Sequence, residues 1–306
     1  MPACILLLLA FAGSSVWLVH ESAHPLPNDY LVTPEKYGML SARAAKVTDE
    51  TWANQDGTRS RGWLLKGTPG APAVVLFHKY GADRSYELNL GVKLNEAANY
   101  TVLMPDMRGH GRSPAVEWSS LGGCETGDAL SAIQFLKGLK SDNQQPLVGP
   151  ELGLYGLEMG ALAALRAASS EPSVKTLVLD SVPQSGDALL ESIVDKRFPF
   201  ASSVTSKIAE YGTRPYYYEG CYQKEAVNDT AKKVNIKSVL LLAGVDAPEF
   251  QDSTLKLSKS FVPGTAVEAK TDLSPSGYGI MNASIDKSGA YDQKVIDFFR
   301  NALGSY

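Results

Sequence analysis

The chain has 306 residues, enough for one large domain with a full hydrophobic core. It is 44% hydrophobic and 20% charged, as ordinary globular proteins are. Its formal net charge of −4, without a lysine or arginine run, excludes an electrostatic nucleic-acid surface. The three cysteines are too scattered for a metal site or a disulfide framework, and no cofactor motif is present. Cys124 and Cys221 would pair in an oxidising compartment, although isolated cysteines are more often small buried hydrophobes.

The first 23 residues are an apolar segment. Ala3 to Val19 contains no charge, and at 17 residues it lies at the short end for a membrane-spanning helix. It also resembles the apolar region of a secretory signal, although no lysine or arginine precedes it. We favour a membrane anchor over a cleaved signal, and either places the body of the protein outside the cytoplasm. Residues 24–46, punctuated by Pro25, Pro27 and Pro34, are expected to be a linker and lead-in.

From residue 47 onward, apolar strands alternate with amphipathic helices. Asp56-Gly57 is a hairpin signal between the first two strands. The expected strands are 47–53, 58–65, 73–77, 101–104, 152–155, 175–180 and 238–242. The expected helices are 86–97, 125–139, 159–168 and a last helix around 295–302. This alternation predicts an α/β domain over 47–306, with a mostly parallel sheet covered by helices on both faces.

Residues 184–233 interrupt this alternation. The segment includes 197–200 and the tyrosine cluster 216–218. It fits a small cap over a site at the edge of the sheet, and it fits equally well a connecting helix pair. Both interpretations remain open at the level of sequence.

The stretch Gly156–Gly160 has the frame of a nucleophile elbow. In the pattern G-x-S-x-G, a sharp strand-to-helix turn lifts a serine hydroxyl above an α/β sheet. Both glycines are present here, with an expected strand before them and an alanine-rich helix after them. Glu158 occupies the position of the serine. The elbow is therefore predicted to present a carboxylate.

Several ordered motifs resemble the α/β-hydrolase superfamily over residues 47–306. His78–Gly81 matches the family's H-G-x-G loop, and residues 106–113 (DMRGHGRS) match its D-x-R-G-x-G-x-S turn. The elbow and Leu179–Pro183 complete the series. The apolar leader makes the chain similar to N-terminally anchored bacterial serine hydrolases. The resemblance implies a mostly parallel central sheet of about eight strands with helices on both faces.

The resemblance also implies a degenerate catalytic triad. A serine hydroxyl is a weak nucleophile until a histidine takes its proton, and an acid orients that histidine. Here Glu158 replaces the serine, and Ala247 stands at the acid position, with Asp246 one residue before it. Tyr278, in Ser276–Gly279, replaces the histidine, and no histidine follows His110.

The oxyanion loop has changed with the triad. Lys79 replaces the loop's first glycine, and by resemblance the N–H groups of Tyr80 and Met159 would be the oxyanion donors. Lys79, Tyr80, Met159 and His78 are the expected binding residues, while His78 and His110 are also expected to brace their turns. We hypothesise that the Glu158 carboxylate pairs with the Lys79 ammonium or with the Tyr278 hydroxyl, within about 4 Å.

The expected function is that of an extracytoplasmic pseudoenzyme, one that binds a small molecule or a protein in the former active-site pocket. The alternative is an active ester, lipid or peptide hydrolase that uses non-standard residues including Glu158. A third possibility is acid–base chemistry by Glu158 with Asp246 or Lys79 on a glycoside or lactone. Neither a metal nor a cofactor is expected, and the expected membrane contact is through the N-terminal segment.

Overall fold

The computed structural model describes residues 2–26, 29–38, 45–112, 114–199, 202–218 and 220–304. Its centre is an eight-stranded sheet in the order β1-β2-β4-β3-β5-β6-β7-β8. β1 and β4 pair antiparallel with β2, and all other neighbours are parallel. The strands are β1 (Val47–Ala53), β2 (Arg59–Leu65), β3 (Ala71–Phe77), β4 (Thr101–Pro105), β5 (Val148–Leu157), β6 (Val174–Asp180), β7 (Ser238–Gly244) and β8 (Ala266–Leu273). The mostly parallel eight-stranded sheet confirms the predicted fold class.

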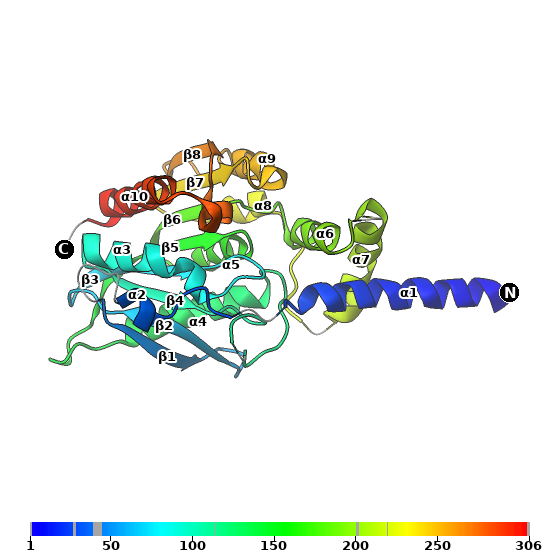
Figure 1. The fold of residues 1–306 in the computed structure, drawn as a ribbon, viewed down its shortest axis with the longest axis horizontal. Coiled ribbons are helices and arrows are strands. Elements are labelled where there is room, and N and C mark those ends of the chain that lie inside the picture. The colour runs from blue at the N-terminus through cyan, green and yellow to red at the C-terminus, as the bar shows by residue number, and fades with distance from the viewer. Residues whose placement is uncertain are drawn as a thin grey trace.

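Helices cover both faces of the sheet (Figure 1). α3 (Leu88–Ala98) and α10 (Ile285–Leu303) share one apolar core with one face of the sheet. The other face packs on α4 (Cys124–Gly138), α5 (Met159–Ala168), α8 (Val227–Ala231) and α9 (Pro248–Leu257). Two short 3₁₀ helices, η1 (Arg84–Glu87) and η3 (Gly277–Asn282), precede α3 and α10.

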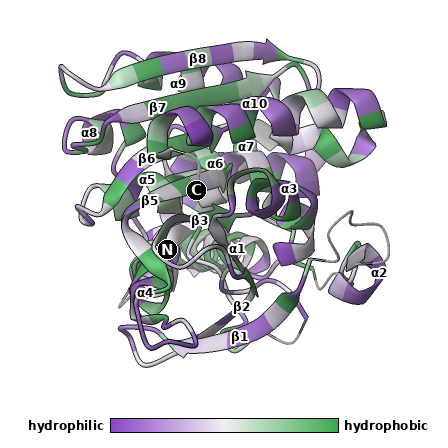
Figure 2. Cartoon of the chain, turned by 90° about the vertical axis from the view of Figure 1, so that its left-hand side faces the viewer, coloured by the Kyte–Doolittle hydropathy of each residue, from purple (hydrophilic) through white to green (hydrophobic). Residues whose placement is uncertain are grey.

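The burial of each strand follows its place in the sheet. β3 is buried at every residue, and β7 at all but its first, because helices cover both faces of these central strands. The edge strand β8 alternates between exposed and half-buried residues, and Figure 2 shows it far more hydrophilic than β7. The expected strands were all runs of apolar residues, so the polar sequence of β8 did not indicate a strand.

The segment 184–233 is helical. It contains α6 (Gly186–Arg197), α7 (Ser202–Tyr216) and α8. α8 packs on α5 and α9, whereas α6 and α7 pack on each other and on α1 (Pro2–Ala23), beside the sheet (Figure 1). We refer to α6 and α7 together as the cap helices.

α1 is one continuous helix with two different environments. Residues 2–14 are exposed and project from the body, whereas Ser15, Leu18, Val19, Ser22 and Ala23 are buried. The helix is long and apolar enough to cross a membrane, by length and composition alone.

The described part of the expected linker lies against the domain. It includes the short helix α2 (Pro34–Gly38). The Tyr30 hydroxyl donates to Asp106 at 3.1 Å, and the Tyr37 hydroxyl donates to Asn89 at 2.7 Å. Residues 29–38 are therefore packed on the body.

Cys124 and Cys221 form a disulfide, with their Cα atoms 4.9 Å apart. The bond joins the first residue of α4 to the chain just after α7. Cys4 is a free, exposed thiol. The sequence left open whether Cys124 and Cys221 pair, and the structure shows that they do.

Candidate functional site

The elbow at Glu158 has the strained backbone of a strand-to-helix turn. β5 ends at Leu157 and α5 begins at Met159, so Glu158 is the single residue between them. Its φ of 52° and ψ of −105° lie where side-chain-bearing residues are uncommon. Its N–H donates to the Asp180 carbonyl of the neighbouring strand at 2.9 Å. The turn thus holds the Glu158 side chain at the carboxyl end of the parallel strands.

The two flanking glycines are required by close packing. A Cβ on Gly156 would lie 2.4 Å from the Gly160 carbonyl oxygen, and a Cβ on Gly160 would lie 2.3 Å from the Phe77 carbonyl oxygen. Backbone atoms cannot yield at such distances, so only glycine fits at either position. The elbow is therefore a closely packed strand-to-helix turn with Glu158 at its centre.

The Glu158 carboxylate binds one of the two N–H groups predicted as oxyanion donors. The Tyr80 N–H donates to Oε2 of Glu158 at 2.9 Å. The other group, the Met159 N–H, acts to lower the pKa of the carboxyl. In an acyl-transfer enzyme such donors stabilise the negative oxygen that develops during the reaction. Here a carboxylate of the same chain occupies the Tyr80 donor.

The side-chain pairing hypothesised for Glu158 is wrong. Neither an ion pair with Lys79 nor a hydrogen bond with Tyr278 is among the contacts of Glu158 in the described chain. The Lys79 ammonium instead donates to the Tyr278 carbonyl at 2.7 Å and lies 4.0 Å from the centre of the Tyr278 ring. The Tyr278 hydroxyl accepts from Lys196 at 2.7 Å. A backbone donor, which is already fixed by its turn, binds the carboxylate in place of the flexible side chains.

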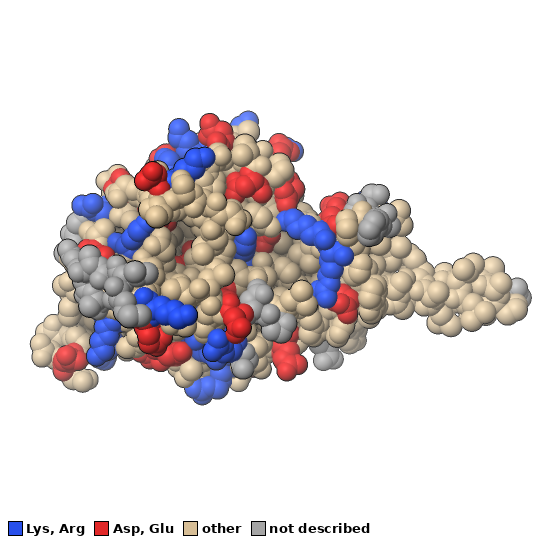
Figure 3. Space-filling view, in the orientation of Figure 1, with Lys and Arg blue, Asp and Glu red and all other residues tan. Residues whose placement is uncertain are grey.

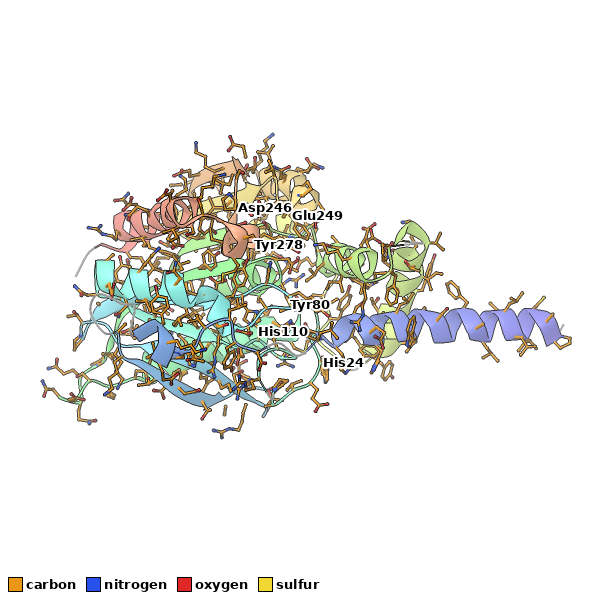
Figure 4. All side chains as sticks on the ribbon, viewed as in Figure 1. His24, Tyr80, His110, Asp246, Glu249 and Tyr278 are labelled. Atoms are coloured by element: carbon orange, nitrogen blue, oxygen red, sulfur yellow. A yellow bond between two sulfur atoms is a disulfide. The ribbon has the colours of Figure 1, made fainter. Side chains whose placement is uncertain are left out.

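Lys196 connects the pocket to α9. Its ammonium bonds to the Tyr278 hydroxyl and forms an ion pair with Glu249 at 2.8 Å. Figure 4 shows Tyr80, Tyr278 and Glu249 on the side of the sheet from which α1 projects. Sequence reasoning missed Lys196, because it lies on α6 in the segment that matches no family motif. A lysine next to arginine at the end of an amphipathic helix was the only available signal.

Ala247, the residue expected at the acid position, lies between β7 and α9, and Asp246 beside it has a bracing contact. Ala247 is wholly buried. The Asp246 carboxylate accepts the Ser276 N–H and the Ser276 hydroxyl, both at 3.0 Å. Asp180 accepts the Gly277 N–H at 2.8 Å. The two acids hold the backbone of the loop that carries Tyr278.

The histidines of the two turns are fixed by backbone groups. The ring nitrogens of His78 bond to the Lys79 carbonyl at 2.8 Å and the Met107 N–H at 3.0 Å. Those of His110 bond to the Arg108 carbonyl and the Gly81 N–H. Burial lowers the pKa of His78 to about 4 and that of His110 to about 3. Both rings are therefore neutral, and His78 has no ring nitrogen left for a ligand.

Glu158 lines a pocket of ≈ 390 Å³ between the sheet and α6. Tyr80, Tyr278, Lys196 and Arg197 share its wall with the apolar side chains of Leu26 and Ile193. Lys79 and Met159 lie behind this lining, and no histidine is among the described residues that form it. The pocket therefore combines an apolar surface, two cations and a buried carboxylate.

Burial controls the ionisation of the pocket. It raises the pKa of Glu158, against the opposing effects of Lys196, the Tyr80 N–H and Lys79. Burial likewise lowers the pKa of Lys79 and raises that of the Tyr278 hydroxyl. Burial also acts to lower the pKa of Lys196, but its bonds to Glu249 and Tyr278 outweigh this and raise it to about 12. Lys196 is thus a fixed cation.

No group of three or more histidine, cysteine, aspartate or glutamate side chains in the described ranges is placed to hold a metal ion. The chemistry open to the site is that of one buried carboxylate, two tyrosines and the nearby ammonium groups. The hydroxyls of Ser192, Tyr80 and Tyr278 also line the pocket, but no histidine that could activate a hydroxyl is among the described residues of its wall.

Comparisons with known proteins agree with this geometry. A family model described as alpha/beta hydrolase fold matches residues 72–217. A thiohydrolase of Arthrinium phaeospermum is 34% identical over 128 residues, and a thiohydrolase of Aspergillus aculeatus is 26% identical over 125 residues. Each match covers 40% of this chain, but only 39% and 37% of those two relatives.

Solved structures share the whole architecture. An esterase of Pyrococcus furiosus superposes with a TM-score of 0.65, covering 92% of this chain and 98% of the esterase, at 19% sequence identity. At that identity the likeness shows the fold alone. Sheet order, elbow and family match agree, and the chain is therefore a protein of the α/β-hydrolase fold.

Proposed function

We propose that this protein is a non-hydrolytic member of its fold, which binds a small molecule in the pocket at Glu158. One observation carries the proposal: the Glu158 carboxylate accepts the N–H group of Tyr80, one of the two expected oxyanion donors. A substrate carbonyl would need both donors as its oxygen becomes negative. With the Tyr80 donor occupied and a carboxylate beside it, the tetrahedral intermediate would be repelled.

The lining of the pocket supports a ligand with a polar group and an apolar part. Leu26 and Ile193 offer apolar contact, and the ammonium of Lys196 offers a polar one. The partners of Lys196, Tyr278 and Glu249, fix its position, so a ligand meets an arranged donor. A fixed donor lowers the ordering cost of binding.

We further propose that the body of the protein lies outside the cytoplasm. The Cys124–Cys221 disulfide supports this, because disulfides persist in oxidising compartments. The apolar helix α1 supports it as well, either as an anchor or as a signal.

An ester assay tests the loss of hydrolysis. Full-length protein and Glu158→Ala are compared on p-nitrophenyl butyrate and on a butyryl thioester. We expect both proteins to give the same rate as the buffer, because neither contains a nucleophile–histidine pair. Turnover by the natural chain that disappears in Glu158→Ala would contradict the proposal.

The same ester also serves as the ligand in a binding test, because we expect it to remain uncleaved. Saturation-transfer NMR should detect p-nitrophenyl butyrate on the natural chain. Ser192→Trp, which fills the pocket, should abolish the signal, and Ser288→Trp on α10, which lines another cavity, is the matched control. An equal signal in both variants would place the ligand elsewhere and refute the assignment of the pocket.

The second candidate function is hydrolysis with Glu158 itself as the reacting group. The strained elbow and the open pocket favour it, since the turn still presents the side chain to a ligand. It also requires a base to activate water for release of the covalent ester, and no histidine lines the pocket. The comparison with Glu158→Ala decides between the two candidates.

A further inference from the structure

We propose that α1 is a permanent part of the folded protein, which inserts its N-terminal half (residues 2–14) into a lipid bilayer and packs its C-terminal half (residues 15–23) against side chains that line the pocket. The pocket at Glu158 then opens beside the membrane surface. This inference does not depend on whether the pocket is catalytic. It rests on the contrast between the two halves of one helix.

The N-terminal half is apolar around its whole circumference. Residues 5–9 are five consecutive isoleucine and leucine residues, which are 57–71% exposed. Five consecutive residues cover more than one helical turn, so no polar face remains for water. In Figure 3 this projecting part of α1 shows no charged side chain on the visible face. Such a surface matches the hydrocarbon of a bilayer.

The C-terminal half is built into the protein. Leu18, Val19 and Ala23 belong to the main apolar core, with at most 3% exposure. α7 approaches so closely that a Cβ on Gly212 would lie 2.1 Å from the Ser15 carbonyl oxygen. Glu21 forms an ion pair with Arg197 at 2.6 Å. Removing this half, as cleavage of a signal would, would open the core.

The boundary between the halves carries the residues typical of a membrane–water interface. Trp17 is 50% exposed and Tyr211 of α7 is 70% exposed, and the Tyr211 ring lies 5.6 Å from that of Phe11. Tryptophan and tyrosine favour the headgroup layer. Lys207 and Arg214 are exposed on the same helix α7. Basic side chains beside an apolar insertion favour anionic lipid.

The last turn of α1 touches the lining of the pocket. The Tyr80 hydroxyl donates to the Ser22 carbonyl at 2.7 Å, and Arg197 donates to the Glu21 carbonyl at 2.6 Å. Both side chains line the pocket. From Ser14, the end of the exposed stretch 2–14, to Glu21 the helix rises roughly 10 Å. An amphiphile leaving the bilayer along α1 would therefore meet the pocket within about two helical turns.

Vesicle flotation of the full chain tests the insertion. Liposomes contain phosphatidylcholine with or without phosphatidylglycerol. The double variant Leu6→Glu with Leu9→Glu should lower the partition coefficient roughly tenfold or more, because each leucine loses its burial in lipid. Val245→Glu with Ile285→Glu, at exposed apolar residues of the body, is the matched control and should bind as the natural chain does. Equal binding by both double variants would overturn the proposal.

Three further measurements test the retention of α1, the packing of its C-terminal half and a second copy as its partner. The intact mass of protein extracted from its native membrane should include α1, and an N-terminus beyond Ser15 would overturn the proposal. Leu18→Ala should lower the Tm, whereas an unchanged Tm would refute the packing of this half into the core. A second copy of the chain is the alternative partner for the exposed leucines, and light scattering tests it. Insertion would be overturned if the natural chain did not bind vesicles and instead formed a dimer that the Leu6→Glu with Leu9→Glu variant converts to a monomer.

Discussion

Two buried charges near the carboxyl edge of the sheet are neutralised in different ways. Arg108, 4% exposed, donates to Asp128 at 2.7 Å and to Asp56 at 2.9 Å. Glu158, 3% exposed, accepts the Tyr80 N–H. Carboxylates neutralise the charge of Arg108, whereas a peptide N–H and the ammonium groups of Lys196 and Lys79 act on the charge of Glu158.

The difference in partners distinguishes Arg108, a charge with a structural role, from Glu158, a charge that can respond to pH or to a ligand. Arg108 joins the turn 106–112 to α4 and to the β1–β2 hairpin, and although it borders two cavities, its guanidinium is held by two carboxylates. Glu158 lines an open pocket, so a ligand or a proton can change its surroundings without breaking an ion pair. We expect the Arg108 cluster to govern stability and Glu158 to govern the response to pH and ligand.

Arg108→Met should give the largest effect. It leaves the Asp128 carboxylate buried without its cation, which costs about 3–5 kcal/mol of unfolding free energy. Burial already raises the pKa of Asp128 to about 6 against the effect of Arg108. Arg112→Met, in the same turn but 60% exposed, is the control and should change stability by less than about 0.5 kcal/mol. Urea unfolding measures both, and equal losses would erase the comparison.

Glu158→Gln should change stability by about 1 kcal/mol, with a sign that depends on pH. The pKa of Glu158 is raised above its ordinary value of 4.5, so the folded state favours its protonated form. Its contribution to stability is therefore fully present below pH 4.5 and is lost as the pH rises through the folded pKa. Glutamine does not titrate, so the Tm of the variant relative to the natural chain should increase from acid to neutral pH.

The control for that titration is Glu117→Gln, at an exposed carboxylate. Its Tm difference from the natural chain should change less with pH. A Tm difference for Glu158→Gln that is flat, or that decreases toward neutral pH, would show that the buried carboxylate is not destabilised by its surroundings.

Lys196→Met should have the smallest effect on stability, within about 1 kcal/mol, because the side chain is 50% exposed. Its effect on Glu158 should be clearer, since the Lys196 charge lowers the pKa of that carboxyl. Carbon-13 NMR titration of the Glu158 carboxyl should therefore show a higher pKa in the variant. Lys256→Met, at an exposed lysine paired with Asp252, is the control. An unchanged Glu158 pKa in Lys196→Met would remove Lys196 from the site.

The fold and the elbow were predictable because their signals are local. The helix after the elbow has its predicted bounds, Met159–Ala168, since close-packed glycines and an alanine-rich run admit few alternatives. The first strand also begins and ends as predicted, at Val47 and Ala53. β8 was not located, because an edge strand with polar side chains lacks an apolar run.

The partners of Glu158 were less predictable than its position. Sequence motifs brought Lys79, Tyr80, Met159 and Tyr278 to one region, and the structure places them there. They could not show whether a side chain or a backbone group would bind the carboxylate, because that depends on rotamers and on the turn. Lys196 and Arg197 come from a segment whose position depends on tertiary packing with α1.

The Cys124–Cys221 bond closes a covalent ring that contains the elbow, β6 and both cap helices. The two cysteines are 97 residues apart in sequence, so nearly a third of the 306-residue chain lies within the ring. A protease that cuts once between α6 and α7 would therefore leave two pieces that stay joined until the bond is reduced. After such a cut, Lys196 and Arg197 of the pocket would remain covalently attached to the C-terminal part of the protein through this bond.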